Sequence, residues 1–522
     1  MRSILTIVRV SRLRWITGSL LLLWTVTAGA EDGFRSIFDG KALTGWEGDT
    51  SIWSVKDGAI TGTTTAENPL KTNTFITWKR GLIDDFELKL QYRIINGNSG
   101  IQYRSRRMPE AGQWVVGGYQ ADFEAGDTYS GILYEERGRG ILAQRGQKTV
   151  IGADHKPIPI GSVGDTAAIQ AKIKKEDWND YHIIARGHHL IHRINGVTTV
   201  EVHDEDLEAR RRSGILAFQA HVGPPMVVQF RNVRLKRLPM GDRKKIVLIA
   251  GRRSHGYGSH DHYAGCMMLK NAIDKNMPGL HAVVYQSDHP EDPSGWTLDP
   301  TALDNADAIV LYMDGGKGHP VRAHRDQVGA LMKRGVGLAC IHYAVEMPKG
   351  EKDGDLFLDW IGGYFEAHWS VNPIWNMTNA TFASDHPITR GVQPFDLKDE
   401  WYYHMRFRPN MEGVQSIISA HPPKSTLDRP DGSHSNNPHV RAAIARGEAQ
   451  VVAWARERPD GGRGFGFTGA HFHRNWQHDG FRTLLLNAVT WVAKAGVPPD
   501  GVRSRTPTAA EMEANMDYPK PE

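Results

Sequence analysis

Residues 190–202 read LIHRINGVTTVEV, and this stretch decides the fold of the first half of the chain. Leu190–Ile194 and Val197–Val202 flank the dipeptide Asn195-Gly196. A two-residue turn of type I′ needs positive φ at both central positions, and Asn followed by Gly adopts that conformation readily. The stretch therefore predicts a β-hairpin.

The sequence around this hairpin keeps the same character from Phe34 to about Leu238. Phe86–Ile94 (FELKLQYRI) alternates apolar with polar residues, which is typical of a strand with one face in water. Other short strands follow, separated by turns rich in Gly and Asn, and no long helical pattern interrupts them. These features predict a β-sandwich or a jelly roll for residues 31–238.

The second half of the chain has a different period. Four short and almost entirely apolar runs indicate strands buried on both faces: Ile246–Ala250, Ala282–Tyr285, Ala308–Met313 and Val336–Ile341. The stretches between them have helical spacing, as in His324–Lys333, and Phe481–Ala495 is typical of a closing amphipathic helix. We therefore expect an α/β domain with a mainly parallel sheet at 244–496, after a linker at 239–243 and before a tail at 497–522 that is either mobile or docked on the surface.

The first 30 residues have the pattern of a secretory signal peptide. Four arginines accompany the apolar run Trp15–Trp24, and the segment ends in Ala28-Gly29-Ala30, a small-residue cleavage pattern. An uncleaved anchor is the alternative, but the run is shorter than the ~20 residues that a spanning helix needs. We expect cleavage after Ala30, export to the periplasm or medium, and no membrane span in the mature protein.

Charge and cysteine content exclude two further classes of protein. The chain has 63 Lys and Arg residues against 59 Asp and Glu, and four of the arginines lie in the leader, so the other 492 residues are balanced at 59 of each. This balance removes the electrostatic basis for a nucleic-acid partner. Two cysteines, Cys266 and Cys340, cannot form a disulfide framework and are predicted to be buried small residues.

An ordered series of motifs spans the first half. The series is GFRSIFDGKALTGWEG (33–48), FELKLQYRI (86–94), GNSGIQYRSR (97–106), GYQADFE (118–124), GILYEERGRGILA (131–143), DWNDYHI (177–183), INGV (194–197) and GILAFQAHVGPPMVVQFRNVRL (214–235). Together these motifs resemble the 3-keto-disaccharide hydrolase domain family. The resemblance implies a concanavalin-like jelly roll that acts on sugars whose C3 hydroxyl has been oxidised to a ketone.

A C3 ketone acidifies the hydrogen on C2, so a side-chain base can remove that proton. The enolate then expels the group at C1 by β-elimination, and water adds to the resulting enone. This route needs a general base and a donor for the enolate oxygen. The matched motifs supply these candidates: Arg104, Asp122, Glu124, Glu136 and His221 as catalytic residues, with Gln120 and Tyr134 in contact with substrate.

The spacing of the acidic residues limits which of them share a site. Gln120, Asp122 and Glu124 are two apart, so they share one face of a strand, either in a sugar cleft or on an ordinary solvated surface. Glu135 and Glu136 occupy opposite faces, so at most one enters a cleft. Some members of the family depend on a divalent cation, and Asp122 and Glu124 offer oxygen ligands suited to Ca²⁺ or Mn²⁺.

A second series of motifs spans residues 244–495. The series is SHGYGSHDHYAG (254–265), GVGLACIHYA (335–344), GGYFEAHWSVNP (362–373), DHPITRGV (385–392), DEWYYH (399–404) and TGAHFHRNW (468–476). It resembles the trehalose-utilisation (ThuA-like) family, which implies a flavodoxin-like fold related to class I glutamine amidotransferases. Those enzymes place a nucleophilic Cys between a buried strand and the next helix, but His342 stands at that position here and Cys340 falls on the strand. Thiolate chemistry is therefore not expected.

Of the 24 histidines in the chain, 17 lie between Arg243 and Gly496. The motifs place seven of them in a predicted site at the carboxyl ends of the strands: His255, His260, His342, His368, His404, His471 and His473. Converging imidazoles suit Zn²⁺, with His260, His342 and His471 as candidate ligands and Glu366, Asp399 or Glu400 as further ligands or supporting groups. The alternative is a polar cleft without metal that binds sugar through His, Trp369 and Trp401. No nucleotide cofactor is expected.

The sequence thus predicts an exported enzyme that cleaves 3-keto-glycosides or 3-keto-disaccharides, fused to a ThuA-like domain of related sugar-catabolic role. Two alternatives remain. One is a conventional glycoside hydrolase acting on unoxidised sugar, which needs two carboxylates about 5–10 Å apart. The other is a non-catalytic carbohydrate-binding protein.

Overall fold

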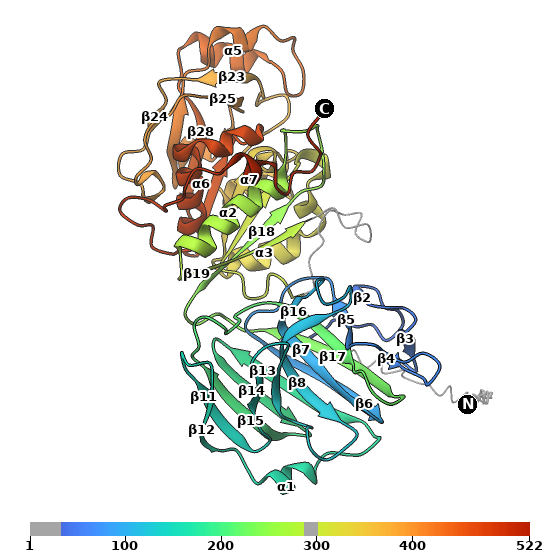
Figure 1. Ribbon diagram of the computed structural model, residues 1–522. Coiled ribbons are helices and arrows are strands. Elements are labelled where there is room, and N and C mark those ends of the chain that lie inside the picture. Colours follow the sequence, from blue (N-terminus) through green and yellow to red (C-terminus); the bar gives the residue numbers. More distant parts are fainter. Residues whose placement is uncertain (1–32, 287–300, 522) are drawn as a thin grey trace, which may run out of the picture.

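A computed structural model describes residues 33–286 and 301–521, which form a β-sandwich followed by an α/β part (Figure 1). The predicted signal peptide lies outside the described residues. None of the described helices is long and apolar enough to cross a membrane.

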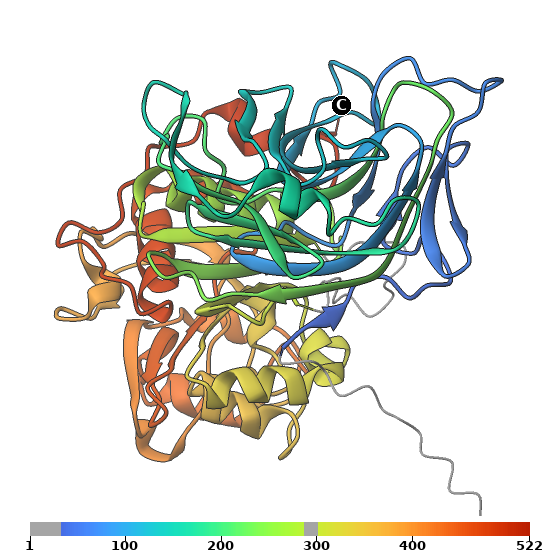
Figure 2. The same ribbon diagram turned by 90° about the horizontal axis from the view of Figure 1, so that it is seen from below.

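The sandwich consists of two sheets whose facing side chains form one apolar core (Figures 1 and 2). The larger sheet contains, in spatial order, β12 (Pro157–Ser162), β11 (Gln147–Ile151), β15 (Val197–Asp204), β14 (His189–Ile194), β13 (Asn179–Arg186), β6 (Phe86–Ile95), β17 (Val227–Arg237), β4 (Ala59–Thr63) and β3 (Trp53–Lys56), with β1 (Arg35–Ser36) beside β17. The smaller sheet contains β10 (Gly140–Ala143), β9 (Leu133–Glu136), β8 (Val116–Glu124), β7 (Asn98–Arg107), β16 (Ile215–Ala220), β5 (Thr74–Trp78) and β2 (Trp46–Glu47). The predicted β-sandwich is confirmed.

The two sequence patterns that predicted this sandwich have the expected geometry. Burial alternates along β6, with Phe86, Leu88 and Leu90 in the core. Strands β14 and β15 pair in antiparallel fashion, and the residues between them have positive φ, +48° at Asn195 and +81° at Gly196. These are the dihedral signs that a type I′ turn requires.

The α/β part is built on an eight-stranded mixed sheet. Its spatial order is β19 (Leu280–Gln286), β18 (Lys244–Ala250), β20 (Ala308–Tyr312), β21 (Gly337–Ile341), β29 (Arg463–Phe467), β28 (Gln450–Glu457), β27 (Val414–Ala420) and β24 (Thr381–Phe382). The strands from β19 to β29 are parallel, and the last three pair in antiparallel fashion. The prediction of a mainly parallel sheet therefore holds for five strands, and the antiparallel extension was not expected.

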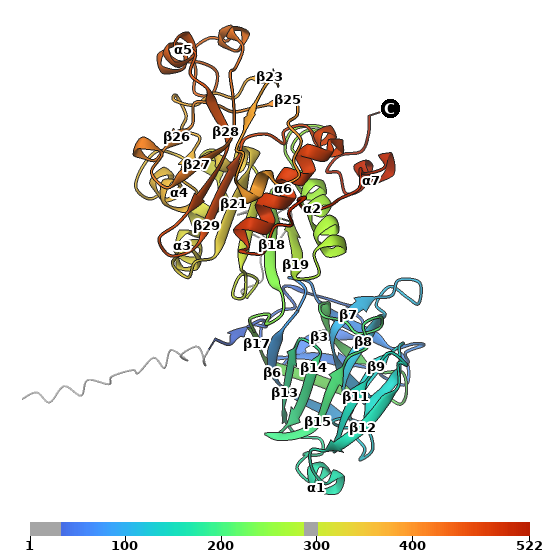
Figure 3. The ribbon, with the colours of Figure 1, turned by 90° about the vertical axis from the view of Figure 1, so that its left-hand side faces the viewer.

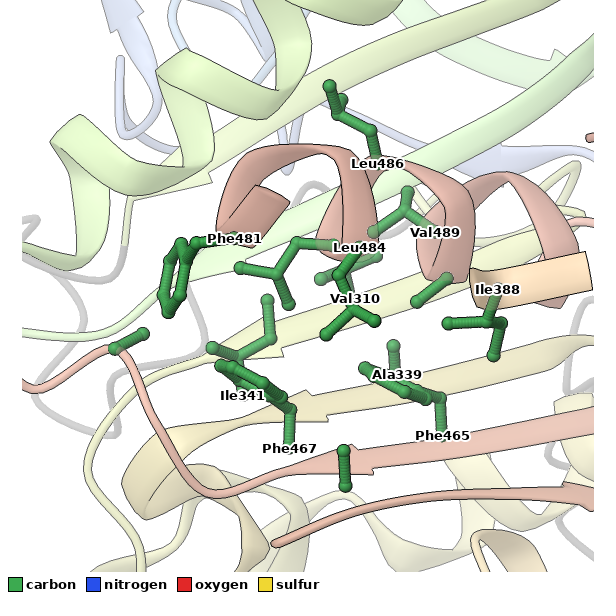
Figure 4. Close-up of a cluster of buried hydrophobic side chains, with 14 of the residues drawn as sticks. Val310, Ala339, Ile341, Ile388, Phe465, Phe467, Phe481, Leu484, Leu486 and Val489 are labelled. Atoms are coloured by element: carbon green, nitrogen blue, oxygen red, sulfur yellow. The ribbon is translucent and has the colours of Figure 1, made fainter. Parts of the chain in front are cut away.

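Helices cover both faces of this sheet (Figure 3). Helices α2 (His262–Asn276) and α6 (Asp479–Val492) pack on one face, and α3 (Arg325–Lys333) and α4 (Gly354–Trp360) on the other. Figure 4 shows Leu484 and Val489 of α6 against the strand residues Val310 and Ala339. Helix α6 is buried on nearly every side, because α2 and the C-terminal residues cover its outer face.

Shorter elements lie beyond the sheet. They are α5 (Pro438–Ala445), the pair β22 (Gly363–Tyr364) and β26 (Arg406–Phe407), and the pair β23 (Ile374–Met377) and β25 (Leu397–Glu400). In the sandwich, α1 (Thr166–Gln170) follows β12. The two cysteines are free and buried, as predicted.

A buried ionic cluster joins the two parts of the chain. Strand β17 ends at Arg237 and β18 begins at Lys244, close to the predicted linker. The carboxylate of Asp84, in the sandwich, accepts a hydrogen bond from the Nη1 of Arg237 at 3.2 Å and forms an ion pair with the Nζ of Lys245, on β18, at 2.7 Å. All three side chains are fully buried, and the two cations hold the pKa of Asp84 low although burial acts to raise it.

The C-terminal residues are packed against the α/β part, which is the docked alternative for the tail. Val502 and Met512 are buried, and helix α7 (Ala509–Glu513) begins with a capping box formed by Thr508 and Glu511. These residues pack beside α2 and α6 (Figure 1). Isolated apolar residues, not a helical repeat, bind this segment to the core. The hydrophobic periodicity of the sequence therefore did not predict that the segment packs there.

Candidate functional sites

A network of polar side chains lies on the smaller sheet of the sandwich, on the face opposite the apolar core. Register pairs Gly100 with Asp122 and Gln102 with Gln120 across β7 and β8. The Nε2 of Gln102 donates to Gln120 Oε1 at 2.6 Å, and Gln120 Nε2 donates to Asp122 Oδ2 at 2.8 Å. A Cβ at position 100 would collide with the Gln120 side chain, so the absence of a side chain at Gly100 leaves the space that Gln120 occupies when it bonds to Gln102.

Asp122 is the most strongly perturbed acid of this network. Its carboxylate is 6% exposed and accepts from Asn98 Nδ2 at 2.8 Å as well as from Gln120. Burial raises the pKa of Asp122 to about 7, with Glu124 and Glu136 adding to the rise and the two amide donors opposing it. A carboxyl group with a pKa near neutrality can act as a general base at physiological pH.

Glu136 extends the network toward the strand ends. Its carboxylate accepts from Gln219 Nε2 at 3.4 Å and from Asn73 Nδ2 at 3.3 Å, and Gln219 lies 3.5 Å from Gln120 Nε2. Tyr134 pairs with Gln120 across β8 and β9 and is partly exposed. Its pKa is raised by burial and by the charges of Glu136 and Asp122, so the phenol stays protonated and can donate.

Three predicted catalytic residues do not join this network. Arg104 is fully buried and donates to Asp85 Oδ1 at 2.9 Å and to backbone carbonyls, so its guanidinium holds the fold instead of facing a substrate. The Glu124 carboxylate accepts the backbone N–H groups of Thr128 and Tyr129 and so fixes the turn after β8. His221 lies just past β16, half-buried, with Nδ1 2.5 Å from the Val222 carbonyl.

The prediction for the two adjacent glutamates is confirmed. Glu136 faces the network, and Glu135 points to the other face, where it pairs with Arg139 at 2.6 Å. A Ca²⁺ or Mn²⁺ site on Asp122 and Glu124 gains no support, because no cluster of three ligand atoms among the described residues includes either. Glu124 Oε1 already accepts a backbone N–H of the following turn, and each Asp122 oxygen already accepts a hydrogen bond from a side-chain amide.

Sequence reasoning missed the amides of the network. None of Asn73, Asn98, Gln102 and Gln219 was among the predicted site residues. For Gln102, the sequence did contain a signal: it lies two residues after Gly100, so both positions share one face of the strand that pairs with the strand of Asp122. Asn73 precedes β5 and carried none.

The second candidate site lies where parallel strands of the α/β sheet end. His260 follows β18, His342 follows β21 directly, and His471 follows β29. The carboxylate of Glu400, the last residue of β25, completes the group. All four ligand atoms lie within 4.8 Å of one another, so three of the predicted histidines do converge.

Four of the six distances between these ligand atoms match the separation of neighbouring ligands on one metal ion. His260 Nε2 is 3.1 Å from both His342 Nε2 and His471 Nδ1, and Glu400 Oε2 is 3.1 Å from His471 Nδ1 and 3.5 Å from His342 Nε2. Zinc bonds to N and O of 2.0–2.1 Å imply a tetrahedron edge of about 3.3 Å.

Surrounding groups orient the imidazoles toward this common point. Asp314 Oδ1 accepts from His260 Nδ1 at 2.8 Å, and the Thr468 carbonyl accepts from His342 Nδ1 at 2.8 Å, so each ring turns its Nε2 toward the other ligand atoms. The Tyr402 hydroxyl also lies 3.2 Å from His342 Nε2. Burial and the neighbouring histidines hold the pKa of His260 far below its usual value, and that ring stays neutral. His342 and His471 hold the pKa of Glu400 low although burial acts to raise it.

The backbone at these positions is strained. His260 and His342 have φ of +54° and +55°, and Ala470, next to His471, has φ of +83°. Positive φ is unfavourable for residues with a Cβ and persists where the surrounding structure imposes it. In the loop that carries His471, the Asp399 carboxylate stabilises the positive φ by accepting hydrogen bonds from the N–H groups of Ala470 and His471.

His255 lies at the edge of this site. Its exposed ring is tilted against that of His260, with centroids 3.7 Å apart, and with His260 and Asp314 it forms a second group that could hold a metal ion. The other predicted residues of this half lie farther away. His368 and His404 lie near Trp369, and His473 Nε2 bonds to the Met512 carbonyl. Trp401 is fully buried and the Trp369 ring is covered by Arg406, His404 and His439, so neither is free to stack on a sugar.

Three further histidines of this half are buried: His262, His281 and His319. His262 lies beside the site, with its ring centroid 5.3 Å from that of His260. His434 pairs with the buried Glu346 at 2.9 Å. Sequence spacing alone gave no indication of these contacts.

The chain matches two family models. Residues 33–236 match the model described as 3-keto-alpha-glucoside-1,2-lyase-like domain, and residues 247–492 match the model described as Trehalose utilisation. No curated protein matches the chain.

Similar solved structures each cover less than half of the chain. A Parabacteroides distasonis protein proposed to be a glycosyl hydrolase is 18% identical over 39% of this chain and 99% of its own, with a TM-score of 0.28. The carbohydrate-binding module CBM66 of Bacillus subtilis is 14% identical over 37% and 95%, with a TM-score of 0.26. A proposed ThuA-like protein from Bacteroides uniformis is 16% identical over 49% and 94%, with a TM-score of 0.33.

The two family matches adjoin in the order that the sequence motifs predicted, and each coincides with one structural part. The chain therefore joins a domain of the carbohydrate-active 3-keto-alpha-glucoside-1,2-lyase-like family to a domain of the Trehalose utilisation family.

Proposed function

We propose that the sandwich cleaves 3-keto-glycosides by removing the C2 proton and eliminating the group at C1. The observation that carries this proposal is the buried Asp122, whose pKa of about 7 suits a general base. The family description, a 1,2-lyase, names the two carbons between which such an elimination forms a double bond.

The steps use groups of the polar network. Asp122 takes the C2 proton, and the electron pair moves into the C3 carbonyl to give an enolate. Tyr134, protonated and partly exposed beside Asp122, is placed to donate to the enolate oxygen. The enolate re-forms the ketone as the C1–O bond breaks, the leaving oxygen takes a proton, and water then adds at C1 while C2 regains a proton.

Aglycone release from an aryl glucoside and from its 3-keto form tests this proposal. Release from the 3-keto form alone is expected. Release from the unoxidised glucoside would instead indicate a conventional hydrolase that uses Asp122 and Glu136 as its carboxylate pair. Binding of both sugars without release would indicate a carbohydrate-binding protein.

We also propose that His260, His342, His471 and Glu400 hold a divalent ion of the zinc type. The donor set of three nitrogens and one carboxylate oxygen, with four of its six interatomic distances at 3.1–3.5 Å and all of them within 4.8 Å, supports this proposal. A bound ion would supply Lewis-acid chemistry toward an oxygen of the sugar. The α/β part would then act on the same class of keto-sugar, and its parallel strands, ordered 2-1-3-4-5, support assignment to the flavodoxin-like class.

Zinc titration of the metal-free protein, followed by competition with a chromophoric chelator, tests the metal proposal. One equivalent should bind in the native protein and be lost in His342→Gln. The exposed His421 lies outside the cluster, so His421→Gln is the matched control and should bind normally. Equal binding in both variants would place the metal elsewhere. An acyl-transfer role for Cys340 is not proposed, because burial raises the pKa of its thiol.

A further inference from the structure

The C-terminal segment, residues 509–517, lies against the two loops that carry His260 and His471. We infer that this segment positions the histidine site, so that metal affinity depends on residues that contribute no ligand. The inference rests on the proposed metal function.

The two loops already form a small unit of their own. The backbone N–H of His260 donates to the His471 carbonyl at 3.0 Å, and Ser259 and Phe472 form an antiparallel bridge. The N–H of His473 donates to the Gly258 carbonyl at 2.9 Å. Two of the proposed ligands are therefore tied to each other through their backbones, and anything that holds this unit also holds the ligands.

The C-terminal segment contacts both loops of this unit. The hydroxyl of Tyr257, three residues before His260, donates to Glu513 Oε1 at 2.6 Å. The N–H of Asp517 donates at 3.1 Å to Asp261 Oδ1, and Asp261 directly follows His260. On the other loop, His473 Nε2 donates to the Met512 carbonyl at 2.9 Å.

The segment is itself anchored in the α/β core and does not merely rest on the loops. Met512 is 7% exposed and belongs to the same apolar cluster as α2 and α6. Earlier along the tail, the N–H of Val502 donates to Asn487 Oδ1 on α6 at 2.8 Å. The segment thus connects α6 to both ligand loops.

This connection has a specific consequence for the ligands. His260 has positive φ, as does Ala470 beside His471, and strained backbone relaxes when the groups that hold it are removed. Without the segment, we expect the lone pairs of His260 and His471 to lose their alignment. Loss of supporting contacts around metal ligands typically lowers affinity by about 10–100-fold.

The experiment compares three forms of the full protein: native, truncated after Thr506, and truncated after Tyr518. The first truncation removes α7 and Asp517, and the second removes only residues 519–522, so it is the matched control. Zinc affinity is measured by chelator competition, and the visible absorption of bound Co²⁺ reports the ligand geometry. We expect zinc affinity at least about tenfold weaker and an altered Co²⁺ spectrum after truncation at Thr506, and native values in the control.

A point variant keeps the test decisive if the longer truncation unfolds the α/β part. Tyr257→Phe removes one contact from an exposed hydroxyl, and we expect a smaller loss of zinc affinity with an unchanged near-ultraviolet circular dichroism spectrum. Native affinity in both the truncation and Tyr257→Phe would overturn the inference while leaving the metal proposal intact. Failure of the native protein to bind Zn²⁺ or Co²⁺ would overturn both.

Discussion

At the scale of single residues, Asp122 carries the proposed chemistry of the sandwich. Asp122→Asn keeps the size of the side chain but removes the base, so we expect kcat on a 3-keto-glucoside to fall by at least about 100-fold. The rate of aglycone release measures this loss. Glu124→Gln retains an acceptor for the turn after β8, so it should remain close to native activity. A larger loss in Glu124→Gln than in Asp122→Asn would contradict the assignment of the base.

The pKa of Asp122 also predicts how activity depends on pH. The carboxyl group must be ionised to accept the C2 proton, and burial raises its pKa to about 7. We therefore expect kcat/KM to rise with pH up to about 7 and then to level off. A profile already level at pH 5 would show that the base titrates with an ordinary carboxyl pKa.

The same residue affects stability. The folded-state pKa of about 7 lies above the usual value of about 3.9, so the folded protein binds the proton more tightly than the unfolded chain does. Its contribution is fully present below pH 4 and is lost as the pH rises through 7, up to about 4 kcal/mol. Denaturant unfolding between pH 4 and 8 should show this fall in the native protein relative to Asp122→Asn. Parallel curves for the two proteins would contradict it.

At the scale of elements, the β14–β15 hairpin offers a direct test of turn geometry. Asn195 has φ of +48°, and its side chain donates to the Lys172 carbonyl and to Asn179 Oδ1. Both Asn195→Ala and Asn195→Gly lose these bonds, but only alanine retains the steric cost of positive φ. We expect the alanine variant to be less stable than the glycine variant by about 1–2 kcal/mol in urea unfolding. Equal stability would mean that the turn relaxes to another form.

The elements also explain how much of each site could be predicted from the sequence. His260, His342 and His471 follow buried parallel strands, and the carboxyl ends of such strands meet at one edge, so their convergence was predictable. Glu400 was only one of three candidates, because it reaches the site from an antiparallel pair outside the main sheet. Arg104 was predicted for the sugar site, but the structure buries its guanidinium against Asp85, a contact that only tertiary packing creates. Strand alternation placed Gln120 and Asp122 together, but it carried no information on Asn73.

At the scale of the whole molecule, the buried contact of Asp84 with Arg237 and Lys245 makes the two domains depend on each other. Asp84→Asn leaves two cations without their shared counter-charge, so we expect a loss of about 3–5 kcal/mol in the free energy of unfolding. The exposed pair of Arg35 and Asp304 also joins the two domains, and Asp304→Asn is the matched control, with an expected loss below about 1 kcal/mol. Similar small losses in both variants would mean that the buried cluster is not a stabilising link.

The measurement that tests the central claim most directly is the fate of the C2 hydrogen during cleavage. The protein is allowed to cleave a 3-keto-glucoside in D₂O, and the early product is examined by NMR beside an enzyme-free sample of the same product. Elimination and hydration through Asp122 predict deuterium at C2 of the released 3-keto-sugar, at a rate that follows aglycone release and is lost in Asp122→Asn. Release of a sugar that keeps its hydrogen at C2 would contradict the account, because the glycosidic bond would then break without C2 proton removal.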